Sequence, residues 1–101
     1  MPTMKMAWMP IAKAAFDELR KRAKDAAKHD EFVQAHNEIV LALRDFDTAF
    51  VKGELLFNTR KAGGEVRLWV NRFISVCYAV FREEQAGWIL KYKTVPDEWP
   101  D

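Results

Sequence analysis

The chain lacks the residues that stabilise a fold through disulfide bonds or bound metal ions. It contains one cysteine, Cys77, in 101 residues, so an internal disulfide is impossible. Cys77 lies in an apolar run, where a thiol behaves as a small buried side chain, and a metal there would lack further ligands. His29 and His36 stand about two helical turns apart, too far to share a metal. We therefore expect no metal and no cofactor.

Long apolar runs are also missing. The longest, from Phe73 to Phe81, is far shorter than the roughly 20 residues that span a bilayer. Near the N-terminus, Pro10, Lys13 and Asp17 interrupt the only candidate for the core of a signal peptide. The sequence therefore predicts a cytoplasmic protein that does not associate with membranes.

Neither sign of charge is in large excess. Lys and Arg number 16, Asp and Glu 15, and the net charge of +1 makes the whole chain a weak attractor for nucleic acid. Charge is unevenly distributed, because residues 51–93 hold eight basic and four acidic side chains. A modestly basic second half is thus followed by an acidic C-terminal tail, residues 96–101.

Motifs of small-molecule enzymes are absent as well. With four glycines in total, the chain has no glycine-rich phosphate loop that opens a helix, and it has no Ser-His-Asp pattern. These absences disfavour nucleotide-dependent enzymes and hydrolases.

The first half of the sequence shows helical periodicity. Residues 5–9 form a short apolar segment, and Pro10 suits the first position of a helix that we expect to reach Lys28. Asp30 is a candidate N-cap for a second helix, which Gly53 follows. The apolar stripe of this second helix consists of Phe32, Ala35, Ile39, Leu43 and Phe46. The pattern predicts a first strand and then a helical hairpin.

The second half shows the pattern of strands. Residues 54–59 and 65–71 predict two strands, the latter with alternating apolar and polar residues. Residues 74–81 are apolar at nearly every position, which is typical of a central strand. Residues 88–95 predict a last strand with Trp88, Leu90 and Tyr92 on one face. Short connections favour an antiparallel meander.

These elements predict one α+β domain over residues 1–101. We expect a helical hairpin packed on a curved, mainly antiparallel sheet, in β-α-α-β-β-β-β order. The register between strands stays undetermined at this point, since the faces of neighbouring strands can be offset.

Four local patterns resemble the RelE/ParE toxin superfamily of bacterial toxin-antitoxin systems. They are residues 6–12 with Phe16 and Leu19, then Ile39 and Leu43 ahead of residues 53–55, then residues 65–70, and finally residues 74–80 with their Tyr-x-Val pattern. The resemblance implies a helical hairpin on one face of a curved sheet and a concave opposite face. It also implies an antitoxin partner, and in ribosome-dependent members that cut messenger RNA, a basic nuclease site. Topoisomerase-directed members of the family inhibit without cleaving RNA.

Candidate site residues follow from this resemblance and from the needs of RNA cleavage. A metal-independent endoribonuclease needs cations for the developing phosphorane charge and groups that transfer protons. Arg67 matches the family arginine, and Tyr92 is the candidate acid or stacking group. The candidates for binding RNA or a partner are Arg60, Lys61, Trp69, Lys91 and Lys93. We expect Trp69 to be the exposed aromatic and Trp88 to belong to the core.

Two functions therefore remain open. The chain is either a toxin-like inhibitor of translation or replication, with endoribonuclease activity as one form, or a non-catalytic protein-interaction module with the same fold. Ser75, at a position where the resemblance places an arginine, favours the second, as does the near-neutral net charge. A simpler alternative is that the basic residues are solvated side chains that prevent aggregation of an open sheet face.

The acidic tail carries an expectation of its own. Pro96 and Pro100 prevent a regular strand, while Trp99 supplies an apolar anchor. We expect the tail to fold back, with its carboxylates near cations of the sheet.

Overall fold

The chain forms eight helices and strands in the computed structural model, which describes residues 3–94. In chain order they are β1 (Lys5–Trp8), α1 (Pro10–Asp25), α2 (His29–Ala42), α3 (Phe46–Ala49), β2 (Glu54–Asn58), β3 (Gly64–Val70), β4 (Ile74–Phe81) and β5 (Ala86–Thr94). The predicted α+β class is confirmed. The expectation for the acidic tail, residues 96–101, lies outside the described residues.

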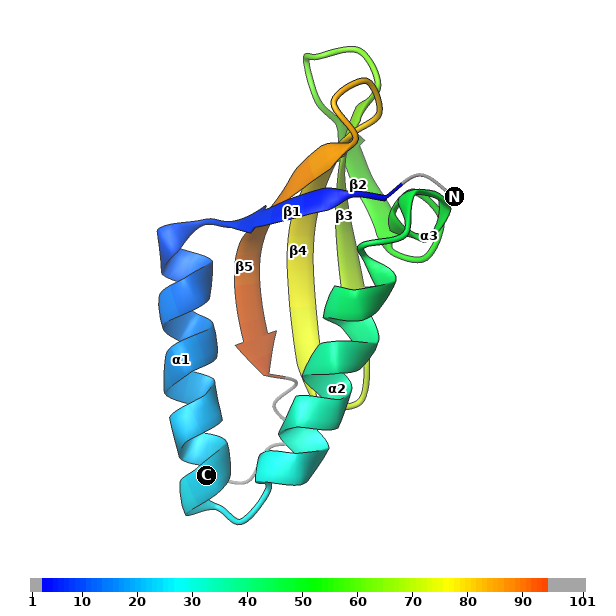
Figure 1. Cartoon of the computed structure of the whole chain (residues 1–101). Coiled ribbons are helices and arrows are strands. Elements are labelled where there is room, and N and C mark those ends of the chain that lie inside the picture. The colour runs from blue at the N-terminus through cyan, green and yellow to red at the C-terminus, as the bar shows by residue number, and fades with distance from the viewer. Residues whose placement is uncertain (1–2, 95–101) are drawn as a thin grey trace.

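The five strands form one mixed sheet in the order β1-β5-β4-β3-β2. The predicted meander is confirmed, because β3, β4 and β5 pair antiparallel in sequence, and β2 pairs antiparallel with β3. β1 is the exception, since it pairs parallel with β5. Figure 1 shows α1 and α2 on the same side of the sheet, with α1 beside β5 and α2 over β4.

The helix boundaries differ from the prediction at the hairpin turn. α1 begins at Pro10 as expected but ends at Asp25, because Ala27 takes a positive φ of 58° that no right-handed helix allows. α2 begins at His29, so Asp30 lies in its first turn rather than at its cap. There its carboxylate still interacts favourably with the positive end of the helix dipole. Within residues 3–94, neither helix combines the length and apolar character needed to cross a membrane.

The short helix α3 was not predicted. Asp45 caps it by accepting hydrogen bonds from the Thr48 amide at 2.9 Å and the Thr48 hydroxyl at 2.7 Å. These hydrogen bonds hold the pKa of Asp45 below its ordinary value. The prediction that Phe46 continues the stripe of the second helix is therefore wrong; it belongs to α3 and packs against Phe50 at 5.0 Å between ring centroids.

The core lies between the helices and one face of the sheet. Its fully buried large side chains are Phe32, Ile39, Leu43, Ile74, Val76, Tyr78, Val80 and Ile89. Removing each such apolar side chain from water contributes about 1.5–3 kcal/mol to folding. Tyr78 is the one polar member, and its hydroxyl donates to the Ala49 carbonyl oxygen at 3.1 Å, which fixes α3 to β4.

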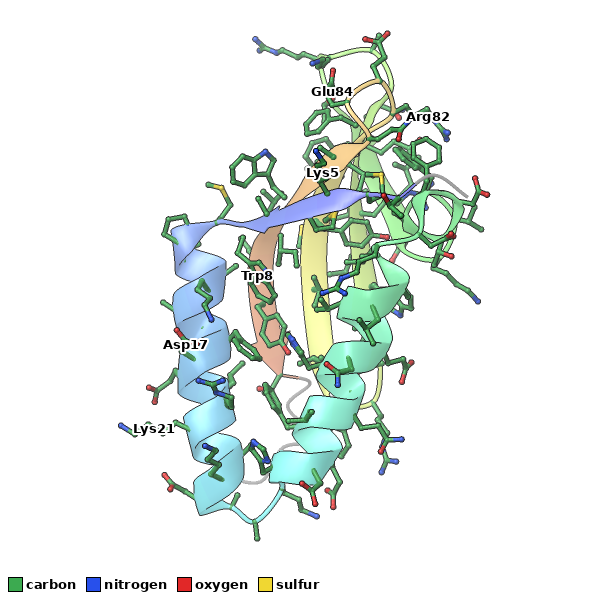
Figure 2. All side chains as sticks on the ribbon, viewed as in Figure 1. Lys5, Trp8, Asp17, Lys21, Arg82 and Glu84 are labelled. Atoms are coloured by element: carbon green, nitrogen blue, oxygen red, sulfur yellow. The ribbon has the colours of Figure 1, made fainter. Side chains whose placement is uncertain are left out.

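An aromatic cluster fills the space between α1, α2 and β5. The His36 ring stacks on Phe16 with 4.4 Å between centroids, and its Nδ1 lies 2.8 Å from the Tyr92 hydroxyl. Trp8 closes the cluster, 5.6 Å from both Phe16 and Tyr92, and Figure 2 shows it over β5. Burial, followed by the positive charges of Lys13 and Arg20, lowers the pKa of His36.

The cluster makes stability depend on pH. Because the pKa of His36 is lower in the folded chain than its ordinary 6.5, the unfolded chain binds the proton more readily. The free energy of unfolding should therefore decrease as pH falls below about 6.5, and the loss should continue down to the lowered folded value. Urea denaturation at several pH values measures this slope.

Two variants serve as controls for this prediction. The double variant His36→Phe, Tyr92→Phe keeps the ring packing and removes both polar partners, so this component of the slope should disappear. His29→Phe, at the exposed start of α2, should leave the slope intact. A slope that survives in the double variant would assign the pH dependence to other groups.

Candidate interaction face of the sheet

The register divides the side chains of the sheet into two faces. One face packs under the helices and supplies the core. The other, here called the open face, is covered by no described helix or strand. Its strand residues, followed through the register from β2 to β1, are Glu54, Leu56, Phe57, Gly64, Val66, Leu68, Val70, Ser75, Cys77, Ala79, Phe81, Ala86, Trp88, Lys91, Lys93, Lys5 and Ala7.

The alternation of β3 is opposite to the prediction. Trp69 pairs with Val76 and Arg67 pairs with Tyr78, and since both partners are core residues, Arg67 and Trp69 lie on the helix-covered face. Val70, on the open face, is 52% exposed. The expectation that Trp69 is the exposed aromatic is thus wrong. The reason is that Arg67 finds polar partners beneath α3, which the sequence pattern does not reveal.

A bulge corrects the predicted faces of β5. Tyr78 pairs with Ile89 and Cys77 with Lys91, so Leu90 is an extra residue without an opposite partner. Trp88 and Tyr92 therefore face opposite sides, although they are four residues apart. Trp88 is 46% exposed on the open face, which contradicts its predicted place in the core.

Arg67 is held inside the domain. Its side chain is 12% exposed, its Nε donates to Glu65 Oε1 at 2.7 Å, and its Nη1 donates to the Gly53 carbonyl oxygen. Arg82 approaches the second oxygen of Glu65 at 3.9 Å, and its guanidinium stacks on the Phe50 ring at 4.1 Å. The network ties β3 to the turn that follows α3. Its donors point to protein acceptors rather than to the open face.

Tyr92 is likewise internal. It is 3% exposed within the aromatic cluster, and His36 is the hydrogen-bonding partner of its hydroxyl. Burial raises the pKa of Tyr92, so the phenol keeps its proton near neutral pH. From this position the hydroxyl cannot protonate a leaving group on the open face.

Lys91 and Lys93 are the candidate residues that lie together on the open face. They border a hollow of about 260 Å³ whose other walls are Leu56, Leu68, Ser75 and Cys77. Among residues 3–94, neither lysine forms an ion pair. Burial raises the pKa of the Cys77 thiol, and the two lysine charges act in the opposite direction. The hollow thus combines mainly apolar walls with two cations that have no acidic partner within the described part of the chain.

Arg60 and Lys61 lie apart from this hollow, in the turn between β2 and β3. Lys61 is ion-paired with Glu84 in the β4–β5 turn, which Figure 2 places at the same end of the molecule. Both basic side chains are exposed. They belong to the tip of the two hairpins and not to the open face beside Lys91.

The predicted site residues therefore fall into three places: Arg67, Trp69 and Tyr92 on the helix-covered face, Lys91 and Lys93 on the open face, and Arg60 and Lys61 at the hairpin tip. Metal-independent RNA cleavage needs proton-transfer groups within hydrogen-bond reach of the same phosphate as the cations. The geometry does not bring Arg67 or Tyr92 to Lys91. Within the described residues, no group of three His, Cys, Asp or Glu could hold a metal ion.

Sequence reasoning did not select two open-face residues, Glu54 and Phe57. Phe57 is 57% exposed on the edge strand β2, and Glu54 faces the same side. An apolar β-strand pattern alone cannot distinguish a core phenylalanine from an exposed one. A signal was available in the composition of β2, because three consecutive apolar residues cannot all face the core.

The Arg67 network predicts a stability effect. Arg67→Ala leaves the Glu65 carboxylate half-buried without its main partner, so we expect the free energy of unfolding to fall by about 2–3 kcal/mol. The matched control is Lys93→Ala on the open face, for which we expect less than ~0.5 kcal/mol. Chemical denaturation measures both. Equal effects of the two substitutions would contradict the structural role of Arg67.

Comparison of the chain with protein-family models, with curated proteins and with solved structures finds no significant match. The interpretation of the open face consequently depends on its own geometry.

Proposed function

We propose that the chain is a non-catalytic protein-interaction module with a RelE/ParE-like fold, and that it binds its partner through the open face. The observation that carries this proposal is the separation of the candidate residues. Arg67 and Tyr92 form internal contacts under the helices, whereas Lys91 and Lys93 border an apolar hollow on the opposite side.

The open face has the composition of a protein interface. Exposed apolar side chains lie beside lysines that pair with no acid of the described residues, as in interfaces with an apolar centre and a polar rim. The large exposed members are Leu56, Phe57, Val70 and Trp88, between 46% and 57% exposed. A partner that covers this face needs apolar side chains over the centre and carboxylates near Lys91 and Lys93. The antitoxin that the family resemblance implies is one protein of this kind.

A toxin-like inhibitor is the second candidate. It draws support from the element order, in which one strand and a helical hairpin precede the four remaining strands, and from two lysines on one face that form no ion pair among residues 3–94. Inhibition of translation or of a topoisomerase by binding alone would use the same face without chemistry. Endoribonuclease activity would require proton-transfer groups beyond Arg67 and Tyr92.

Inducible expression in a bacterial host tests the proposal. We expect no cleavage of messages on induction, because the open-face residues between positions 3 and 94 include no assembled acid-base pair. Primer extension on abundant messages is the measurement. Cleaved messages that disappear in the Lys91→Glu, Lys93→Glu double variant would overturn the non-catalytic proposal. Growth arrest with intact messages would favour the toxin-like inhibitor that acts by binding.

Affinity for RNA provides a second test. If RNA contacts only Lys91 and Lys93, about two phosphates are neutralised, and raising the salt from 50 to 200 mM should weaken binding roughly sevenfold. Fluorescence anisotropy with a short single-stranded RNA measures this dependence. Tight binding that salt does not weaken would contradict a face with two cations.

A further inference from the structure

On four of the five strands, β2 to β5, the open face carries rows of register partners whose ends match about the line between β3 and β4. One row of register partners runs across the four strands from Glu54 on β2 through Leu68 and Cys77 to Lys91 on β5. The row therefore has a carboxylate at one end, an ammonium group at the other, and apolar or weakly polar side chains between them.

A second row repeats this arrangement with aromatic ends. It runs from Phe57 on β2 through Val66 and Ala79 to Trp88 on β5. Phe57 and Trp88 are 57% and 46% exposed, so both ends offer aromatic surface. The two inner residues are small enough to let a facing layer approach.

Between the two rows, the two strands at which the rows end, β2 and β5, carry one bulge each. In β2 the register shifts between Leu55 and Phe57, and in β5 Leu90 is the extra residue. The residue inserted in β2 is Leu56. Neither Leu56 nor Leu90 belongs to the core cluster. β2 and β5 thus match in three respects: opposite charges in one row, aromatic rings in the other, and a leucine at each bulge.

A two-fold axis parallel to the strands, above the line between β3 and β4, would place β2 of one copy over β5 of another. Glu54 would then face Lys91 of the second copy, and Phe57 would face Trp88, each contact occurring twice. Among residues 3–94, neither Glu54 nor Lys91 has an ion-pair partner within its own chain.

We propose that the occupant of the open face is a second copy of this chain, packed face to face as a two-fold symmetric sandwich. The inference rests on the proposed function, in which the open face is the interaction surface, and it names the partner. Facing sheets pack about 10 Å apart, a gap that a lysine and a glutamate side chain can bridge together. The usual rotation of about 30° between packed sheets displaces the row ends by only a few ångströms.

The size of the face sets the expected affinity. Four strands spaced about 4.8 Å apart, with roughly seven residues each, present roughly 400 Å² in projection per copy. Over both copies this is about 800 Å², below the roughly 1,200 Å² of standard interfaces, so we expect a weak dimer that dissociates in the high-micromolar range. Sedimentation equilibrium of the full chain over that concentration range should show a reversible monomer–dimer transition.

Charge reversal tests the pairing of Glu54 with Lys91. Glu54→Lys and Lys91→Glu each place two like-charge contacts in the interface, and each should weaken dimerisation about tenfold or more. The double variant Glu54→Lys, Lys91→Glu restores opposite charges and should dimerise within about threefold of the original chain. The matched control combines Glu54→Lys with Lys93→Glu, two residues further along the same face, and should not recover. Circular dichroism melting of each variant checks that the substitutions leave the monomer folded.

Each outcome has a defined meaning. A chain that stays monomeric at millimolar concentration would overturn the inference. So would a dimer that is insensitive to the single reversals, or one that the double reversal does not restore. None of these results would affect the proposed function, which fails instead if expression produces cleaved messages that depend on Lys91 and Lys93.

Discussion

The bulge at Leu90 determines what each face of the sheet contains. Without an extra residue, Trp88, Leu90 and Tyr92 would share one face, and the lysines would share the other with Ile89. The register shift lets Ile89 and Tyr92 both enter the core, while Trp88, Lys91 and Lys93 all lie on the open face. The contact between Tyr92 and His36 depends on this shift, and so does the hollow beside Cys77. One inserted residue thus separates the buried polar pair from the exposed cations.

The sequence predicted correctly those elements whose residues are mostly buried or whose ends carry a clear signal. β4 was predicted with its observed bounds because nearly every position is apolar, and α1 begins at Pro10 because proline suits a helix start. The prediction of exposed residues was wrong where a polar side chain forms its hydrogen bonds inside the domain. The alternation of β3 suggested an exposed Arg67, but Glu65 and the Gly53 carbonyl satisfy its donors under the helices. Period-2 patterning identifies two faces and cannot say which of them a third element will cover.

The same limit explains why the candidate site could not be assembled in advance. Lys91 and Lys93 were recognised as sharing a face because they are two residues apart. Whether Arg67 joined them depended on hydrogen-bond register across β4, which single-strand patterns leave open. The alignment of Glu54 on β2 with Lys91 on β5, three strands away, is visible only in the register of the whole sheet. Such relations arise from the sheet as a whole and leave no local signal.

An exposed apolar face requires a control against unspecific association. Flat apolar sheet surfaces tend to aggregate, and charges placed on them restrict which contacts are favourable. Among the described strand positions of the open face, Glu54 is the only acid, and Lys91 and Lys93 are the cations nearest the hollow. A facing layer that slides along the strands would remove Lys91 from a carboxylate and bury the ammonium group unpaired, which is costly. The charges therefore contribute more to the specificity of binding than to its affinity. The aromatic side chains of Phe57 and Trp88 supply the apolar contact.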